Sequence, residues 1–266
     1  MASHPHSALL FLTGVMAAVA MMPSGLGQVD RTPSSESSRP TVIVVGFTGG
    51  FVRRDDDRHP EVQMIERLSE EDIPGVHATV YENRRRGKVY KMVLHWLDAN
   101  GDGHLSAAEK RNARVILFGH SWGGSAAIKL ARELNRHGIP VLMTIQVDSI
   151  NKIWGDDCVI PPNVGEAINF YQTRGIVHGC RSLRAADPSR TRILGDYRYE
   201  YTSQPAGCRS YSWMNRHVFK THEATDCDPR IWSQINERIR AEIDSAQLVL
   251  AKSGAAELAG AETPQE

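Results

Sequence analysis

Six apolar, β-branched runs alternate with helical stretches along residues 41–250, and this alternation limits the fold more than any other property of the chain. The runs lie at Thr41–Val45, Val76–Tyr81, Val115–Phe118, Val141–Val147, Ala167–Tyr171 and Arg192–Tyr199. The first four are nearly continuous in apolar residues, which is typical of parallel strands covered on both faces. The sequence therefore predicts an α/β fold with a mostly parallel central sheet of about six strands and helices on both faces.

The stretches between these runs carry helix signals. Four helices are expected, at residues 60–71, 87–97, 123–137 and 229–250. Pro60 begins the first, and Asp228 is an N-cap residue followed by Pro229 at the first helical position of the last. A domain over residues 41–252 follows, and the Ala-, Gly- and Glu-rich residues 253–266 are expected to form a disordered tail.

The N-terminal region differs from the rest in having no charge: residues 1–29 contain no Lys, Arg, Asp or Glu. Ala8–Met22 is an apolar run that would span roughly 22 Å as a helix, less than the roughly 30 Å hydrocarbon core of a bilayer. The small residues Gly25 to Gly27 then offer a cleavage site. We expect a signal peptide over residues 1–27, a flexible Ser/Pro-rich linker over 28–40, and a secreted or periplasmic protein. The start lacks Lys and Arg, so an uncleaved membrane anchor is the alternative.

Charge and cysteine content narrow the class of protein further. The chain has 31 basic and 31 acidic side chains, a balance that argues against a nucleic-acid partner. After cleavage of the signal peptide, no membrane span is expected. Four cysteines, an even number in an exported chain, predict two disulfides with three possible pairings. They are Cys158, Cys180, Cys208 and Cys227.

The strongest chemical motif is the run from Val115 to Ala127, which predicts a strand, the pentapeptide Gly119-His-Ser-Trp-Gly123, and a helix of small residues. A tight strand-to-helix turn leaves no room for a Cβ two residues on either side of the serine. The serine is then held in a strained conformation with its hydroxyl above the sheet, near a helix N-terminus that favours negative charge. Ser121 is thus a candidate nucleophile, and a structural glycine-rich turn is the alternative.

This motif, in this context, resembles the nucleophile elbow of the α/β-hydrolase superfamily, including its lipase, esterase and thioesterase members. The resemblance covers about Thr41 to Leu250. It implies a catalytic acid and a histidine that follow Ser121 in the order serine, acid, histidine. Only about 18 residues separate Asp148 from the following strand, so a small lid and an open site are expected.

Asp148 is the best candidate for the acid because it follows the strand after the elbow helix, and catalytic groups of parallel sheets gather at the carboxyl ends of strands. This placement resembles the branch of the superfamily with its acid one strand earlier than usual. Asp196 and Asp226 are weaker alternatives. Two histidines, His217 and His222, precede the last helix. Loop length favours His222 as the catalytic base, and the choice between the two stays open.

Two backbone N–H groups are needed to stabilise an oxyanion. Trp122, directly after the serine, supplies one. By resemblance, the other comes from the glycine-rich loop after the first strand, where Phe47 is the favoured donor and Thr48 is next.

Residues 98–109 match the calcium-binding loop of an EF-hand at its diagnostic positions. The expected ligands are Asp98, Asn100, Asp102, the His104 carbonyl, Ser106 and Glu109. Because this loop precedes the strand whose far end carries Ser121, one bound Ca²⁺ is expected to be structural. The exit from the loop is short and no second loop pairs with it, so the expected Kd is roughly 10⁻⁴ to 10⁻³ M. An Asp/Gly turn without calcium is the alternative.

Together these features predict an exported serine hydrolase that cleaves carboxylic esters, with a small-molecule or lipid-like substrate and one structural Ca²⁺. Two alternatives stay open. One is a non-catalytic, calcium-binding envelope protein on the same scaffold, and the other is an acyltransferase or thioesterase with the same triad. The sequence does not indicate the oligomeric state.

Overall fold

A computed structural model of the chain describes residues 41–151 and 156–261; the expected signal peptide and linker lie outside the described residues. A six-stranded sheet has the order β2-β1-β3-β4-β6-β8, and all its neighbouring strands are parallel. The strands are β1 (Thr41–Thr48), β2 (Val76–Glu82), β3 (Ala113–His120), β4 (Val141–Val147), β6 (Val164–Tyr171) and β8 (Arg192–Arg198). The predicted α/β fold is thereby confirmed.

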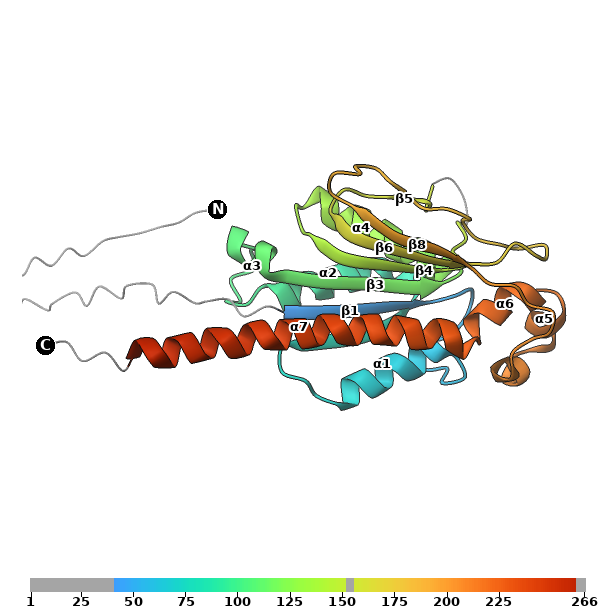
Figure 1. The fold of residues 1–266 in the computed structure, drawn as a ribbon, viewed down its shortest axis with the longest axis horizontal. Coiled ribbons are helices and arrows are strands. Elements are labelled where there is room, and N and C mark those ends of the chain that lie inside the picture. The colour runs from blue at the N-terminus through green and yellow to red at the C-terminus, as the bar shows by residue number, and fades with distance from the viewer. Residues whose placement is uncertain (1–40, 152–155, 262–266) are drawn as a thin grey trace, which may run out of the picture. The chain divides into compact units, whose positions relative to one another are not determined.

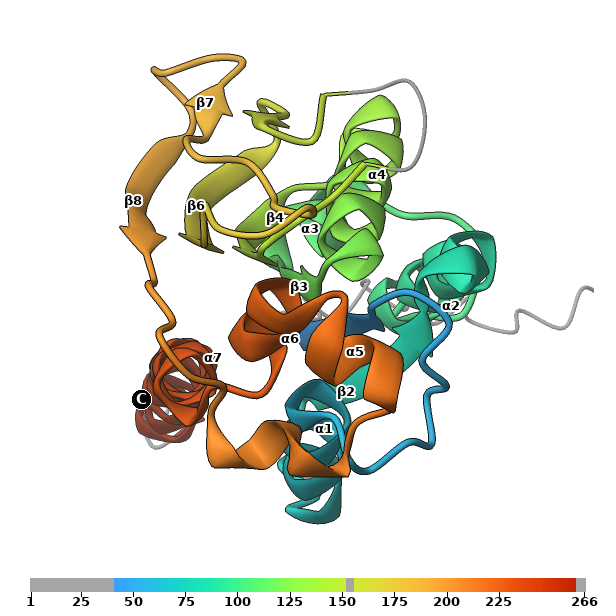
Figure 2. The same cartoon turned by 90° about the vertical axis from the view of Figure 1, so that its right-hand side faces the viewer.

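Helices cover both faces of this sheet (Figures 1 and 2). The long ones are α1 (Pro60–Glu70), α2 (Arg86–Leu97), α4 (Trp122–Arg136) and α7 (Pro229–Ala261). Alternate side chains of β1 point to opposite faces, as the period of a strand requires. Ile43 and Val45 pack with α2 and α4, whereas Val42 and Val44 pack with α1 and α7. The sheet thus has an apolar core on each face, which accounts for the nearly continuous apolar runs in the sequence.

The carboxyl ends of β3 and β4 place the residues that follow them side by side. In the parallel register, His120 at the end of β3 pairs with Val147 at the end of β4. Ser121 and Asp148 follow directly. Two short helices, α5 (Trp213–His217) and α6 (Lys220–Asp226), lie at this end of the sheet (Figure 2). Both belong to the segment between β8 and α7, so the cover over the strand ends comes from there.

Several elements differ from the sequence-based expectation. The helices α3 (Ala107–Asn112), α5 and α6 and the 3₁₀ turns η1 (Asn83–Arg85) and η2 (Ala206–Ser210) are too short to leave a periodic pattern. A second small sheet pairs β5 (Val159–Ile160) with β7 (Arg184–Ala185). Helix α7 continues past the expected end at Leu250 to Ala261, into the predicted disordered tail, because the added residues are rich in strong helix formers.

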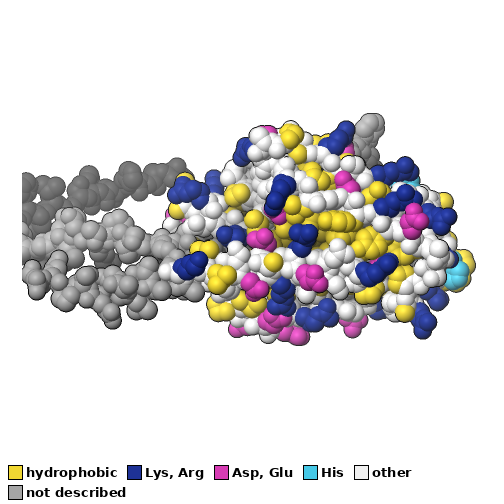
Figure 3. Space-filling model, in the orientation of Figure 1, with side chains coloured by type: hydrophobic (Ala, Val, Ile, Leu, Met, Phe, Trp, Pro, Cys, Tyr) yellow, Lys and Arg dark blue, Asp and Glu magenta, His cyan; other side chains and the backbone are white. Residues whose placement is uncertain are grey.

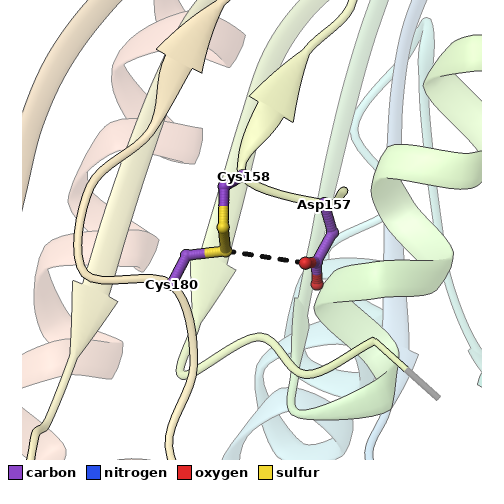
Figure 4. Close-up of side chains that lie close together, drawn as sticks. All are labelled: Asp157, Cys158 and Cys180. Atoms are coloured by element: carbon purple, nitrogen blue, oxygen red, sulfur yellow. Dashed lines mark hydrogen bonds between the residues drawn. A yellow bond between two sulfur atoms is a disulfide. The ribbon is translucent and has the colours of Figure 1, made fainter. Parts of the chain in front are cut away.

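Both expected disulfides are present, and the structure resolves the pairing that the sequence left open. Cys158 bonds Cys180, with Cα atoms 5.7 Å apart, and Cys208 bonds Cys227, with Cα atoms 5.3 Å apart. Figure 4 shows Asp157 directed at the first of these, its Oδ1 3.5 Å from Sγ of Cys180. Burial raises the pKa of Asp157. The bonded sulfurs are not thiolates, so this group does not form a thiolate metal site.

The charge balance of the sequence also holds locally on the surface. Lys and Arg side chains are interspersed with Asp and Glu over the face shown in Figure 3. A search of the described residues finds no helix with the length and apolar character needed to cross a membrane.

Candidate active site

Ser121 occupies the sharp turn between β3 and α4 in the conformation that the motif predicts. Its φ is 56° and its ψ is −124°, a region that non-glycine residues rarely adopt. The backbone N–H of Ser121 donates a hydrogen bond to the Val147 carbonyl at 2.9 Å, which fixes the turn to the end of β4. The neighbouring strand thus holds the Ser121 backbone in this strained conformation.

The two glycines of the pentapeptide are required by the close approach of backbone segments. A Cβ at Gly119 would lie 2.5 Å from the carbonyl carbon of Gly123. A Cβ at Gly123 would lie 2.0 Å from the carbonyl oxygen of Phe47. Side chains at these positions would push α4 away from β1 and β3, and Ser121 with it.

His222 bridges the serine and the aspartate. Its Nε2 lies 2.8 Å from Oγ of Ser121, and its Nδ1 lies 2.7 Å from Oδ2 of Asp148. All three side chains are buried. The carboxylate only accepts, so Nδ1 carries the proton and Nε2 is the acceptor that faces the serine hydroxyl. The structure therefore brings the three predicted residues into one chain of hydrogen bonds, from Asp148 through His222 to Ser121.

Two further donors hold the Asp148 carboxylate, and the sequence analysis missed both. The backbone N–H of Gly179 donates to Oδ1 at 2.6 Å, and Nε2 of Gln172 donates to Oδ2 at 2.8 Å. A Cβ at Gly179 would lie 2.5 Å from the backbone of Asp148, so only glycine fits there. Gln172 directly follows β6, the strand beside β4. Its position at a strand end is the signal that could have identified it.

The alternatives for acid and base lie elsewhere. The His217 ring is on α5, exposed, with its Nδ1 2.8 Å from the Trp213 carbonyl oxygen. Asp196 on β8 accepts hydrogen bonds from Asn169, Ser182 and the backbone of Leu183. Asp226 pairs with a different histidine, described below. Among these candidates in the described part of the chain, only His222 contacts the Ser121 hydroxyl, and only Asp148 bonds that histidine on its other nitrogen.

The predicted oxyanion donors lie on both sides of the serine. Trp122 is the first residue of α4 and contributes to the pocket above Ser121. Phe47 is fully buried near the end of β1, opposite Gly119 in register. Thr48, the second choice, donates its hydroxyl to the Val52 carbonyl at 2.8 Å and so shapes the loop beside the pocket. Their role in stabilising an oxyanion stays a prediction.

A pocket of about 580 Å³ opens in front of Ser121 and His222. Most of its walls are apolar, from the β1–α1 loop, the strand ends and α5. These side chains are Phe51, Trp122, Ile150, Val177, Met214 and Phe219. Phe51 is 84% exposed and packs edge-on against the Trp122 ring, with ring centroids 5.5 Å apart. The pocket is large enough for a small organic ligand with an apolar part.

A second cluster of ionisable side chains is buried behind His222. Nδ1 of His59 lies 2.7 Å from Oδ2 of Asp226, and the Tyr211 hydroxyl donates to the same oxygen at 2.6 Å. Burial alone would lower the pKa of His59, but the charge of Asp226 and this hydrogen bond raise it to about 9. Burial lowers the pKa of His120 to about 4. Sequence reasoning considered Asp226 only as an alternative catalytic acid and missed its pairing with His59 and Tyr211, because no motif links these residues, which are far apart in the sequence.

The predicted calcium loop connects α2 to α3 at the opposite end of the sheet from α5 and α6 (Figure 1). Asp98 accepts from the backbone N–H groups of Asp102 and Gly103, and Asp102 accepts from that of His104 at 2.7 Å. Gly101 and Gly103 have φ values of 70° and 80°, which suit glycine. The loop thus has a compact turn of inward-facing oxygens.

At the exit of this loop, Ser106 and Glu109 form a capping box at the N-terminus of α3. The Glu109 carboxylate accepts from the backbone N–H groups of Ala99 at 2.9 Å and Ser106 at 2.8 Å. These bonds close the loop and hold the pKa of Glu109 below its usual value. Asn100 donates to Asp102 at 3.0 Å. Oxygen donors of this kind suit Ca²⁺.

Comparisons with known proteins give weak likenesses. No protein-family model and no curated protein matches the chain. A cutinase-like protein from Cryptococcus sp. matches with a TM-score of 0.30 and 14% identity, over 47% of this chain and 62% of its own length. A mutant of the esterase rPPE matches with a TM-score of 0.26 and 14% identity, over 46% of this chain and 38% of its own. The chain covers less than two thirds of either structure.

Proposed function

We propose that this protein is an exported serine hydrolase that cleaves carboxylic esters with Ser121, His222 and Asp148. The observation that carries the proposal is the unbroken chain of hydrogen bonds from Asp148 through His222 to a strained serine at the floor of an apolar pocket. A structural glycine-rich turn would need neither a histidine at 2.8 Å from the serine hydroxyl nor a carboxylate behind that histidine.

The mechanism follows from the position of each proton. Nε2 of His222 accepts the proton of the Ser121 hydroxyl while Oγ attacks the carbonyl carbon of the ester. Asp148 keeps the proton on Nδ1 and stabilises the imidazolium that forms. The imidazolium then protonates the leaving alcohol, which leaves an acyl group on Oγ. Water, deprotonated by the same Nε2, hydrolyses that acyl-enzyme and returns the proton to the serine.

The oxyanion of each tetrahedral intermediate is proposed to accept hydrogen bonds from the N–H groups of Trp122 and Phe47. Trp122 begins α4, so the positive end of the helix dipole favours the same negative charge. This contribution is independent of the proton transfers to His222. Trp122 thus has two separate proposed roles: its backbone N–H stabilises the oxyanion, and its indole side chain forms part of the pocket wall.

The pocket walls indicate the class of substrate. Apolar side chains dominate around Ser121, and Phe51 and Met214 are both more than half exposed at this pocket. Such walls favour the apolar acyl or alcohol group of a small-molecule or lipid-like ester. Two disulfides favour a protein that folds in an oxidising compartment, which supports export.

The decisive experiment compares Ser121→Ala with Ser125→Ala, a buried serine one turn further along α4. Ser121→Ala should abolish hydrolysis of p-nitrophenyl esters and labelling by a fluorophosphonate, with unchanged circular dichroism. Ser125→Ala should keep both activities. Hydrolysis or labelling retained by Ser121→Ala would refute the proposal, and a folded wild-type protein inert in both assays would favour the non-catalytic envelope protein.

We also propose that residues 98–109 bind one structural Ca²⁺, by the ligand set that the motif predicts. The compact turn, the positive φ of its glycines and the convergence of Asp98 and Asp102 on the loop backbone support it. The eight residues of β3 separate this loop from Ser121. At about 3.3 Å per residue, the ion would be on the order of 25 Å from the chemistry. Its proposed effect is therefore on stability.

Calorimetric titration with Ca²⁺ tests this binding. With a Kd of about 1 mM, 10 mM Ca²⁺ would stabilise the fold by about 1.4 kcal/mol and raise Tm by about 3–5 °C relative to EGTA. Asp98→Asn, which changes the first loop position, where the pattern requires Asp, should remove the shift, whereas Asp187→Asn, in an exposed turn, should keep it. A Tm indifferent to EGTA in the wild type would contradict the structural role.

A further inference from the structure

A buried group of two carboxylates and an imidazole lies behind the active site. It consists of His59, Glu61 and Asp226, which are 4%, 0% and 0% exposed. One ligating atom of each lies within 4.8 Å of the others. His59 directly precedes α1, Glu61 is in its first turn, and Asp226 ends α6. The group therefore joins two helices from opposite ends of the chain.

Three oxygens of this group have no hydrogen-bond donor among the described residues. They are Oε1 and Oε2 of Glu61 and Oδ1 of Asp226. A buried carboxylate without donors is costly, because it loses its hydration and gains nothing in return. The two carboxyl groups also lie close together, with an oxygen of each within 4.8 Å of the other, so two negative charges here disfavour one another.

The ring of His120 adds a fourth atom that an ion could bind. Its Nε2 lies 3.4 Å from the carbonyl oxygen of His222, and its Nδ1 lies 3.4 Å from Oδ1 of Asp226. Both of these oxygens only accept, and a neutral ring carries one proton, so one of the two contacts has no proton. A cation at Nδ1 would resolve this, because the ring proton would then be on Nε2 and could be donated to the His222 carbonyl.

We propose that His59, Glu61 and Asp226 bind a divalent transition-metal ion, with Zn²⁺ preferred, and that Nδ1 of His120 is its fourth ligand. The ion supplies the positive partner that the three carboxylate oxygens lack, and at Nδ1 of His120 it leaves the ring proton on Nε2 for the His222 carbonyl. Two carboxylates neutralise its charge, and a mixture of imidazole nitrogens and carboxylate oxygens suits Zn²⁺ in four-coordinate geometry. Nδ1 of His59, now hydrogen-bonded to Asp226, gives up its proton and binds the metal instead.

This site is distinct in chemistry from the calcium loop. Residues 98–109 offer oxygen atoms only, which a hard cation prefers, whereas the buried group includes two imidazole nitrogens. It is distinct also from the group at Asp157, whose sulfurs are joined in a disulfide. A metal ion that prefers nitrogen ligands therefore tests the buried group separately from the calcium loop.

The position of the site gives the metal a role in holding the catalytic base. Asp226 lies one helical turn after His222 on α6, and His120 directly precedes Ser121. The His120 and His222 rings are in contact, with centroids 4.6 Å apart. An ion bound here would tie α6 to the turn that carries the nucleophile. His59 forms part of the pocket wall, so the pocket gives the ion a route to the site.

The first test measures metal binding by the purified full-length protein, stripped with a chelator and then supplied with excess Ca²⁺ to saturate residues 98–109. We expect one Zn²⁺ per chain by elemental analysis after dialysis. Co²⁺ in its place should give intense visible absorption bands typical of four-coordinate cobalt with nitrogen ligands. A wild-type protein that retains no Zn²⁺ at stoichiometric concentration, and gives no such Co²⁺ spectrum, would overturn the proposal.

The second test uses a matched pair of variants on α1. Glu61→Gln removes a ligand charge at the buried position, and Glu66→Gln makes the same change at an exposed position of the same helix. Glu61→Gln should weaken Zn²⁺ binding by about 100-fold or more, while Glu66→Gln should bind as the wild type does. Equal affinity of all three proteins would overturn the site. Ser121→Ala should keep full Zn²⁺ binding, so failure of the proposed hydrolase activity leaves this test intact.

Discussion

Two histidine–aspartate pairs lie side by side at the carboxyl end of the sheet, and their geometry is nearly the same. In each, Nδ1 of the ring lies 2.7 Å from a carboxylate oxygen: His222 with Asp148, and His59 with Asp226. In each, the aspartate is fully buried and the histidine is 4% exposed. A search for buried histidine–aspartate pairs alone would rank them equally as catalytic.

The pairs differ in what surrounds them. Asp148 receives two further hydrogen bonds, from Gln172 and Gly179, so both its oxygens have donors. Asp226 receives one, from Tyr211, and its other oxygen has no donor among the residues that the structure describes. Nε2 of His222 faces the Ser121 hydroxyl at 2.8 Å, whereas Nε2 of His59 faces the Asp56 carboxylate at 3.9 Å.

The chemistry of such a pair therefore depends on what faces Nε2, the ring nitrogen that does not bond the aspartate. A nitrogen that faces a hydroxyl can act as a general base, provided that the carboxylate holds the proton on the other side. A ring with a carboxylate near each nitrogen favours the imidazolium: the charge of Asp226 and its hydrogen bond to Nδ1, followed by the charges of Glu61 and Asp56, raise the pKa of His59 to about 9. We therefore propose proton transfer as the role of the first pair and the binding of positive charge as the role of the second.

The largest expected effect is on turnover and comes from Asp148→Asn. Gly179 and Gln172 each donate to one oxygen of the residue, so an amide NH₂ must face a donor in either orientation. If it faces His222, it favours the wrong tautomer, with the proton on Nε2. We expect kcat to fall by about 10³- to 10⁴-fold, measured with a p-nitrophenyl ester. A loss below tenfold would show that Asp148 is not the orienting acid.

The matched change in the other pair, Asp226→Asn, should act mainly on stability. It removes the charge that faces His59⁺, and breaking a buried ion pair from one side costs about 3–5 kcal/mol. Urea denaturation in the presence of EDTA measures this loss. The fall in kcat should be far smaller than for Asp148→Asn. If Asp226→Asn lowers kcat more than Asp148→Asn does, the catalytic pair is His59 with Asp226 and our assignment is wrong.

The sequence predicts the first pair better than the second for a topological reason. Ser121 and Asp148 follow consecutive strands of the sheet, and parallel strands bring their carboxyl ends together, so a motif and strand order suffice. His59 and Asp226 are 167 residues apart, in a loop and a short helix, and only the folded chain brings them together. Gln172 lies between these two cases: its position after a strand is visible in the sequence, but its place beside Asp148 depends on β6 lying next to β4.

The secondary structure shows a similar limit. The inner strands are predicted because burial on both faces makes them nearly continuous in apolar residues, and the long helices because one buried face repeats at the helical period. Helices α5 and α6 have 5 and 7 residues and contain few apolar positions. Packing at the strand ends and the Cys208–Cys227 disulfide hold this segment, and neither is visible in local periodicity. His222 was therefore placed in a loop by the sequence analysis, whereas it lies on α6.

Glu223, next to His222, gives a pH-dependent test of the electrostatics between the two pairs. Burial, and then the charge of Asp226, raise the pKa of Glu223 from 4.5 to about 7. The folded protein therefore binds this proton more tightly than the unfolded chain does. The resulting stability is present below pH 4.5 and is lost as the pH rises to 7.

Glu223→Gln should consequently be more stable than the wild type above pH 7, by up to about 3 kcal/mol, and the difference should vanish below pH 4.5. Urea denaturation of metal-free protein at pH 4, 6 and 8 measures it, with Glu237→Gln on the exposed face of α7 as the control. A constant difference across this range would mean that Glu223 does not titrate there.

The smallest effect is expected from Gln172→Met, which removes one donor from Asp148 without changing its charge. The Gln172 amide bonds Oδ2 of Asp148 at 2.8 Å and the Val177 carbonyl at 2.8 Å, so it fixes the carboxylate to a wall of the pocket. The loss of one hydrogen bond to a charged group, about 1.4 kcal/mol, should lower kcat by about tenfold and leave KM unchanged. Gln63→Met, at an exposed position of α1, should change neither constant. Asp226 lacks such a second donor. If kcat is unchanged in Gln172→Met, the number of hydrogen-bond donors to the carboxylate is therefore not what separates the two pairs. The group that faces Nε2 of each histidine would then be the feature that distinguishes them.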